Sequence, residues 1–142
     1  MLTVKQLLER KGSQIYSIGP EEPVLEAIQL MADKYIGALL VMRGAELVGI
    51  VSERDYARKV ILLGRSSAET PVWQIMSSPV ITVSPEHTLT ECMKIVTDKR
   101  ARHLPVVQDG RVLGLVSIGD LVKAVMEEQQ QQIEQLERYI TS

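Results

Sequence analysis

The sequence contains two copies of one pattern, separated by 65 residues. Gly-Ile-Val-Ser-Glu-Arg-Asp at 49–55 is matched by Gly-Leu-Val-Ser-Ile-Gly-Asp at 114–120. The flanking residues align at the same offset without a gap, as Pro20 does with Pro85. A fixed-offset internal match indicates a repeated structural unit, so we interpret the chain as two copies of roughly 50 residues.

Apolar periodicity predicts the same element order in both copies, namely β-α-β-β-α. In the first copy the elements are expected at 15–18, from Pro23, at 38–42, at 47–51 and from Ser52. In the second copy they are expected at 80–83, 89–96, 103–107, 111–116 and from Ser117. Asp-Gly at 109–110 is a strong hairpin signal between the last two strands. The predicted fold class is α/β (α+β), with two repeats and a C-terminal helical extension.

The repeats set the expected domain organisation. The segments are an N-terminal helix at 1–12, repeat 1 at 13–64, a linker with a short helix at 65–78, repeat 2 at 79–128 and a helical tail at 129–142. The whole chain is expected to form one module.

The final helix is predicted to continue past the repeat. Apolar residues follow a spacing of 4, 3, 4, 3, 4, which is typical of a coiled-coil seam with one polar position at Gln129. The seam is formed by Val122, Met126, Gln129, Ile133, Leu136 and Ile140. Two outcomes stay open: self-association through this tail, or packing of the tail onto its own domain.

Composition limits the classes of function. The 142 residues carry a net charge of -2, so no global basic field attracts nucleic acid. No apolar run approaches the roughly 20 residues needed to span a bilayer. A single cysteine, Cys92, is consistent with a reducing cytoplasm. Neither His87 nor His103 has metal-type spacing with Cys92, and there is no P-loop or dinucleotide fingerprint. We therefore expect no enzymatic activity, no metal and no obligatory cofactor.

The duplicated Gly-x-x-Ser-x-x-Asp motif, at the end of a hairpin strand and the start of a helix, resembles the CBS domain (named for cystathionine β-synthase). Leu-Pro-Val-Val at 104–107 is similar to that family as well. The resemblance covers about residues 12 to 128. It implies two repeats packed about a pseudo-twofold axis, binding of an adenosyl ligand in the cleft between them, and a flat homodimer. It also implies a regulatory role read by a separate, unknown effector protein.

The motif suits a nucleotide on chemical grounds. A carboxylate accepts hydrogen bonds from both ribose hydroxyls, a task assigned to Asp55 and Asp120. A helix start favours phosphate, and Ser52 and Ser117 can bond phosphate or sugar. Residues of the first strands are expected around the base. The full set of predicted ligand-binding residues is Asp120, Ser117, Asp55, Ser52, Thr82, Ile81, Arg102, His103, Pro105, Ser17, Tyr16, Gly37 and Arg54.

The copies differ at the entry of their middle strand. Arg102 and His103 are the candidates for phosphate contact in repeat 2, whereas Gly37 brings no charge and Arg54 is expected to compensate in repeat 1. His103 is alternatively a packed strand residue. Lys59 is interpreted as ordinary surface.

Two readings of the motif remain. Ser-x-x-Asp also fits a capping box, in which the acidic side chain satisfies a backbone N–H. The favoured function is a regulatory sensor of AMP, ADP, ATP, NAD(H) or S-adenosylmethionine, and the alternative is a ligand-free scaffold acting through its dimer surface and tail.

Overall fold

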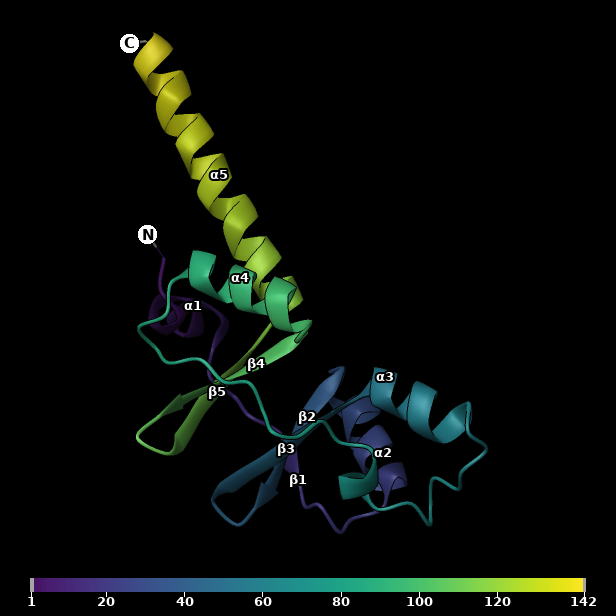
Figure 1. Ribbon diagram of the computed structural model, residues 1–142. Coiled ribbons are helices and arrows are strands. Elements are labelled where there is room, and N and C mark those ends of the chain that lie inside the picture. The colour runs from purple at the N-terminus through teal and green to yellow at the C-terminus, as the bar shows by residue number, and fades with distance from the viewer. Residues whose placement is uncertain (1, 142) are drawn as a thin grey trace. The chain divides into compact units, whose positions relative to one another are not determined.

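The computed structural model describes residues 2–141, and the chain forms two compact units (Figure 1). One unit contains residues 14–81 and 109–112, and the other contains the remaining described residues. The predicted mixture of helices and sheets is confirmed. In chain order the elements are α1 (Val4–Lys11), β1 (Ser17–Ile18), α2 (Val24–Lys34), β2 (Ala38–Arg43), β3 (Glu46–Ser52), α3 (Glu53–Tyr56), η1 (Ala57–Ile61), η2 (Val72–Gln74), α4 (Leu89–Lys99), β4 (His103–Gln108), β5 (Arg111–Ser117) and α5 (Ile118–Thr141).

Repeat 1 forms a three-stranded sheet in the order β1-β2-β3. β1 runs parallel to β2, with Ser17 opposite Leu40. β2 and β3 form the predicted antiparallel hairpin, which begins with Ala38 opposite Ser52. This register places the Ser52 motif at the start of β2.

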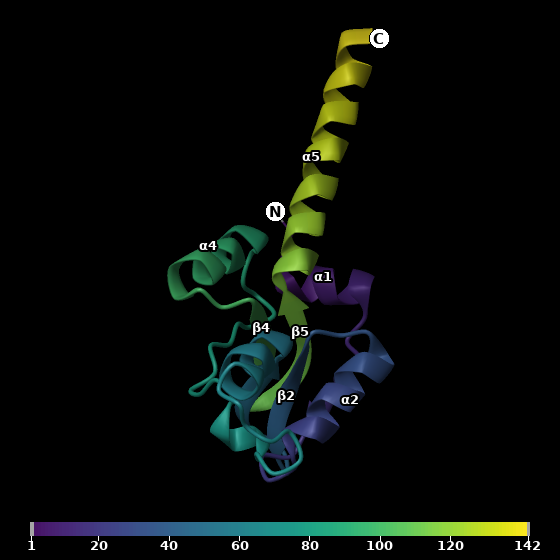
Figure 2. The ribbon, with the colours of Figure 1, turned by 90° about the vertical axis from the view of Figure 1, so that its right-hand side faces the viewer.

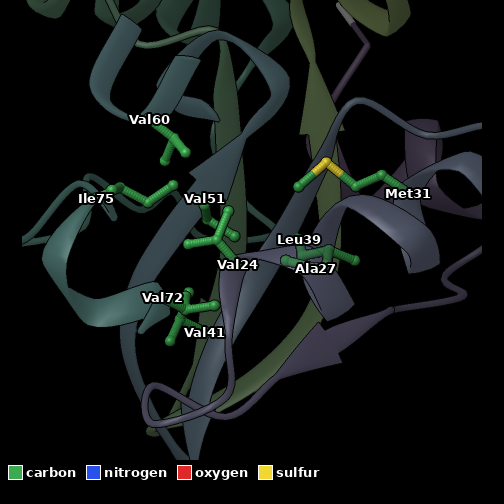
Figure 3. Close-up of a cluster of buried hydrophobic side chains, with 9 residues drawn as sticks. All are labelled: Val24, Ala27, Met31, Leu39, Val41, Val51, Val60, Val72 and Ile75. Atoms are coloured by element: carbon green, nitrogen blue, oxygen red, sulfur yellow. The ribbon is translucent and has the colours of Figure 1, made fainter. Parts of the chain in front are cut away.

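The core of repeat 1 is made by the apolar stripe of α2, strands β2 and β3, η1 and the segment that follows η1 (Figure 3). Its buried members are Val24, Ala27, Met31, Leu39, Val41, Val51, Val60, Val72 and Ile75. The helical residues among them recur every three to four positions, which is the pattern that turns one face of a helix inward.

The linker completes repeat 1. Pro23 precedes α2 and provides no side-chain cap. The first free N–H groups of α2 instead donate to linker carbonyls, from Val24 to Thr70 at 2.8 Å and from Leu25 to Ser67 at 3.0 Å. Orphan donors at a helix start need such partners. The linker is therefore part of the first unit.

The N-terminal helix completes repeat 2. The backbone N–H of Val4 donates to the carbonyl of His87, and Leu89 N donates to the carbonyl of Leu2 at 2.9 Å. Leu89 matches Val24 at the 65-residue offset. The segment that precedes each repeat thus provides backbone carbonyls that accept hydrogen bonds from the first turn of the helix in the other repeat.

The predicted strand at 80–83 is wrong. In this segment only Val83 forms a bridge, parallel to Val106, and β4 and β5 make a two-stranded sheet. The reason lies in Pro105. In repeat 1, Leu40 N donates to Tyr16 O at 3.2 Å, and Pro105 stands at the position of Leu40 without an N–H to donate. The β-α-β-β-α order therefore holds in full only in repeat 1.

The helix after Ser52 also departs from expectation. It has four α-helical residues in α3 and then widens into the π-helical turn η1. Gly64 follows with φ of +67°, the left-handed conformation in which helices commonly end. A widened turn of this kind is often found at functional sites.

The tail is a direct continuation of α5, which runs for 24 residues. Leu121 and Ala124 are its buried residues, while every residue from 129 to 141 is exposed. Figures 1 and 2 show its C-terminal half standing clear of α1 and α4. The tail does not pack back onto its own unit.

Candidate ligand-binding sites

Both Ser-x-x-Asp motifs form a hydrogen-bonded loop at a helix start. Asp55 N donates to Ser52 Oγ at 3.2 Å, and Ser52 N donates to Asp55 Oδ2 at 2.9 Å. In repeat 2, Asp120 N donates to Ser117 Oγ at 3.1 Å, and Ser117 N donates to Asp120 Oδ2 at 2.9 Å. These are the reciprocal bonds of a capping box. The capping role is therefore real in both copies, whatever else the residues do.

A further backbone hydrogen bond joins each motif to the residue that directly precedes the middle strand of its repeat. Glu53 N donates to Gly37 O at 3.0 Å, and Ile118 N donates to Arg102 O at 2.9 Å. The two donors match at the 65-residue offset, and so do the two acceptors. The repeats therefore bring Gly37 beside Ser52 and Arg102 beside Ser117, as the proposed sites require.

The strand entries differ in charge. The exposed side chain of Arg102 lies next to half-buried His103 at the start of β4. Gly37 is exposed and brings no side chain. In repeat 1 the motif itself contains one cationic residue, Arg54, which is exposed. Because their cationic residues differ, the two candidate sites would present different electrostatic potentials to an anionic ligand.

The residues predicted to line the ligand pocket beyond the motif differ from one another in exposure and contacts. Tyr16 packs against the core of repeat 1, and Lys34 Nζ lies 5.4 Å from the centre of its ring. Ser17 and Thr82 are exposed, Ile81 is half-buried, and Pro105 is buried. Pro105 is also tied to its neighbour because its carbonyl accepts from Val83 N at 3.0 Å. The role of the first four in binding a base, and of Pro105 in binding the ligand, stays a prediction.

Sequence reasoning missed two lysines. Lys59 Nζ lies 3.3 Å from Asp55 Oδ1 and donates to Ile75 O at 2.9 Å. Lys11 Nζ donates to Asp120 Oδ2 and to Leu115 O, both at 2.7 Å. The Asp55–Lys59 pair has the i, i+4 spacing of a helix and could have been found in the sequence. The Lys11–Asp120 pair spans 109 residues, and no local pattern announces it.

The electrostatic balance at Asp120 favours the carboxylate. Burial is the largest single influence and opposes ionisation, but it is outweighed. The hydrogen bond and charge of Lys11, together with the bonds from Ser117, lower the pKa of Asp120 below its usual value. The bonds from Lys11 Nζ and from the backbone N–H of Ser117 both fall on Oδ2 of this carboxylate.

The cysteine and one histidine occupy structural positions: the thiol is buried, and the ring of His87 is hydrogen-bonded to the backbone. Cys92 is buried on α4, and burial raises the pKa of its thiol to about 11. His87 Nδ1 accepts a hydrogen bond from Ser84 N at 2.9 Å. Among the described residues there is no cluster of three or more His, Cys, Asp or Glu side chains placed to hold a metal ion. None of the described helices combines the length and apolar character that crossing a membrane requires.

Comparison with known proteins gives a consistent result. The model of the CBS domain family matches residues 4–61 and 72–127. A putative signal-transduction protein with CBS domains from Burkholderia ambifaria is 51% identical, with 89% of this chain and 96% of that chain covered and a TM-score of 0.86.

Two further relatives widen the comparison. The mitochondrial CBS domain-containing protein CBSX3 of Arabidopsis thaliana is 42% identical over 84% of this chain, which spans 61% of that protein. The CBS domain pair of protein MJ0100, solved with 5-methylthioadenosine and S-adenosyl-L-methionine, shares the fold with a TM-score of 0.80 at 22% identity, covering 90% of this chain and 98% of that one. The duplicated motif, the paired strand-entry bonds and these matches agree: the chain belongs to the CBS domain family and contains two CBS repeats.

Proposed function

We propose that the chain is a non-catalytic regulatory module that binds an adenosyl ligand through its Ser-x-x-Asp motifs, first of all at Asp120. The observation that carries this proposal is the charged, half-buried carboxylate of Asp120 at the start of α5, where the backbone N–H of Ile118 also bonds the carbonyl of Arg102, a residue with an exposed side chain. A carboxylate accepts from ribose hydroxyls, and a guanidinium pairs with phosphate. The expected ligands are AMP, ADP, ATP, NAD(H) or S-adenosylmethionine.

Six of the predicted residues have a defined role in this proposal. Asp120 and Asp55 accept from ribose hydroxyls, while Ser117 and Ser52 bond sugar or phosphate. Arg102 and His103 meet phosphate in repeat 2. The binding of an adenosyl compound by a protein of the same fold supports the ligand class. A free, buried thiol supports a reducing compartment such as the cytoplasm.

The experiment is thermal unfolding and calorimetric titration against the adenosyl panel, with GTP as the base control. At 100 times its dissociation constant, a ligand of the native state adds about 2.7 kcal/mol of stability. Asp120→Ala should weaken binding by about 1.5–3 kcal/mol, the range for a hydrogen bond to a charged group.

Because Asp120→Ala also removes a cap, the chain offers a matched control. Thr88 and Glu91 form the same capping box at the start of α4, with Glu91 N donating to Thr88 Oγ1 at 3.1 Å. Glu91→Ala should cost the stability of one capping box and leave ligand affinity unchanged. Equal losses of affinity in both variants would contradict the ribose role of Asp120.

A second candidate function is a scaffold that acts through α5. The observation in its favour is the exposed apolar seam of the tail, in which Met126 is 64%, Leu136 61% and Ile140 73% exposed. A helical segment of this length is marginal in water without a partner. We propose homodimerisation through this seam. A scaffold would assemble through the tail and show no ligand in the titration above.

A further inference from the structure

Each candidate carboxylate is held by a lysine that also reaches a backbone carbonyl, but the lysines come from different places. Lys59 belongs to the same helical segment as Asp55. Its counterpart at the 65-residue offset is Ala124, which is buried and has no charge. Repeat 2 thus lacks a lysine at the position equivalent to Lys59, and Lys11 of α1 supplies the ion pair from outside the repeat.

The position of α1 is fixed by packing against the motif strand. A Cβ at Gly114 would lie 2.8 Å from Leu8 Cδ2, so any side chain at this position would have to displace the side chain with which α1 packs on β5. The backbone of Lys5 donates to Pro85 O at 2.9 Å. α1 then ends at Lys11, where the ammonium bonds the carbonyl of Leu115, the residue that follows Gly114. Lys11 is therefore placed at the site by a docked helix.

Lys11 and a ribose would use the same acceptor. The ammonium lies 2.7 Å from Asp120 Oδ2, with the side chains 32% and 26% exposed. A cis-diol that engages both oxygens of Asp120 meets the lysine already bonded to one of them. A neutral nucleoside gives the displaced ammonium no new partner, whereas a phosphate on the same sugar does.

We propose that Lys11 is a specificity-determining residue of the repeat 2 site: it pairs with Asp120 in the free protein and transfers to the phosphate of a bound nucleotide. The site then selects phosphorylated adenosyl ligands over adenosine. This inference rests on the proposed function. It also couples ligand binding to the docking of α1, because Lys11 at the end of that helix gives up its ion pair with Asp120 and pairs with the ligand phosphate instead.

The test compares the dissociation constants of AMP and adenosine in the full chain by calorimetry. Lys11→Met keeps the aliphatic stem and removes the charge. We expect adenosine to bind more tightly and AMP to lose its advantage, so that the ratio of the two constants falls by about three- to tenfold. Lys11→Arg should restore most of the ratio. Lys59→Met, the matched change at Asp55, should leave the ratio of the repeat 2 site unchanged.

The outcomes separate the two proposals. A ratio unchanged by Lys11→Met, in a protein that binds AMP, overturns the role of Lys11 and leaves the proposed function intact. Binding of adenosine by Lys11→Met but not by wild type supports the proposal, since the lysine then masks the site. If no ligand of the adenosyl panel binds either protein, the proposed function fails and this inference fails with it. Circular dichroism of each variant establishes that it is folded.

Discussion

At the scale of single residues, Asp120 shows how one side chain serves folding and a candidate site together. Its carboxylate caps α5 and pairs with Lys11. Both interactions favour the ionised form, and together they overcome the effect of burial on its pKa. A group with this balance makes folding stability depend on pH.

The sign of that dependence follows from the lowered pKa of Asp120. Its contribution is fully present above the unfolded pKa, near 3.9, and is lost as the pH falls through the lower folded pKa. We expect Lys11→Met to reduce the free energy of unfolding at pH 7, and the difference from wild type to shrink below about pH 4. Urea unfolding at pH 7 and pH 3 measures this. Lys5→Met, an exposed change on the same helix, is the control, and a difference that is constant with pH would contradict the expectation.

Cys92 carries a separate prediction. Burial on α4 raises the pKa of its thiol to about 11, so the nucleophilic thiolate is scarce at neutral pH. We expect an aromatic disulfide reagent at pH 8 to label the folded protein far more slowly than the protein in guanidinium chloride. Rapid labelling of the native state would place the thiol at an accessible surface instead.

At the scale of elements, the first glycine of each motif lies where another segment of the chain packs against the motif strand. Gly49 meets Met76 Sδ and lies close to the backbone of Ser77, and Gly114 meets Leu8. In both repeats the partner belongs to the segment that precedes the other repeat. The motif thus encodes a packing surface as well as a candidate site.

We expect Gly114→Ala to destabilise the protein by about 1–3 kcal/mol, because the added methyl overpacks the contact between α1 and β5. Gly119→Ala is the control. It lies in the first turn of α5, where an added Cβ meets only Ser117 Oγ at 3.6 Å, and it should stabilise by up to about 1 kcal/mol. Urea unfolding measures both. A neutral Gly114→Ala would show that α1 packs less closely than described.

At the scale of the whole molecule, the exposed seam of α5 is the surface through which we propose that the chain assembles. Ile at 133 and 140 alternates with Leu136, a pattern that favours a two-stranded parallel coiled coil. In a parallel pair in register, Gln129 faces its own copy, and the two amides can bond each other. An antiparallel pair would set Gln129 against apolar residues and leave it unsatisfied.

We therefore expect the chain to dimerise and Leu136→Glu to weaken the dimer by at least about tenfold, because it places like charges in the seam. Gln135→Glu makes the same change of charge beside the seam and should leave the dimer intact. Sedimentation equilibrium measures both. A wild-type chain that stays monomeric, or equal effects of the two variants, would contradict assembly through α5.

The sequence alone determined the repeat, the strands of both hairpins, the main helices and the Ser-x-x-Asp pairs, because each rests on local spacing or on a matched offset. It misplaced the strand at 80–83, since the effect of Pro105 depends on which residue pairs with it. It left the motif open between cap and ligand site, and the structure shows the cap in both copies.

Tertiary structure alone decided which segment completes which repeat. The linker supplies carbonyls to α2, while α1 joins repeat 2 and brings Lys11 to Asp120. Hydrogen-bond donors at a helix start and a charged carboxylate both need partners, but they accept any partner of suitable chemistry. The sequence therefore shows which groups require a partner, and only the path of the folded chain determines which distant residue provides it.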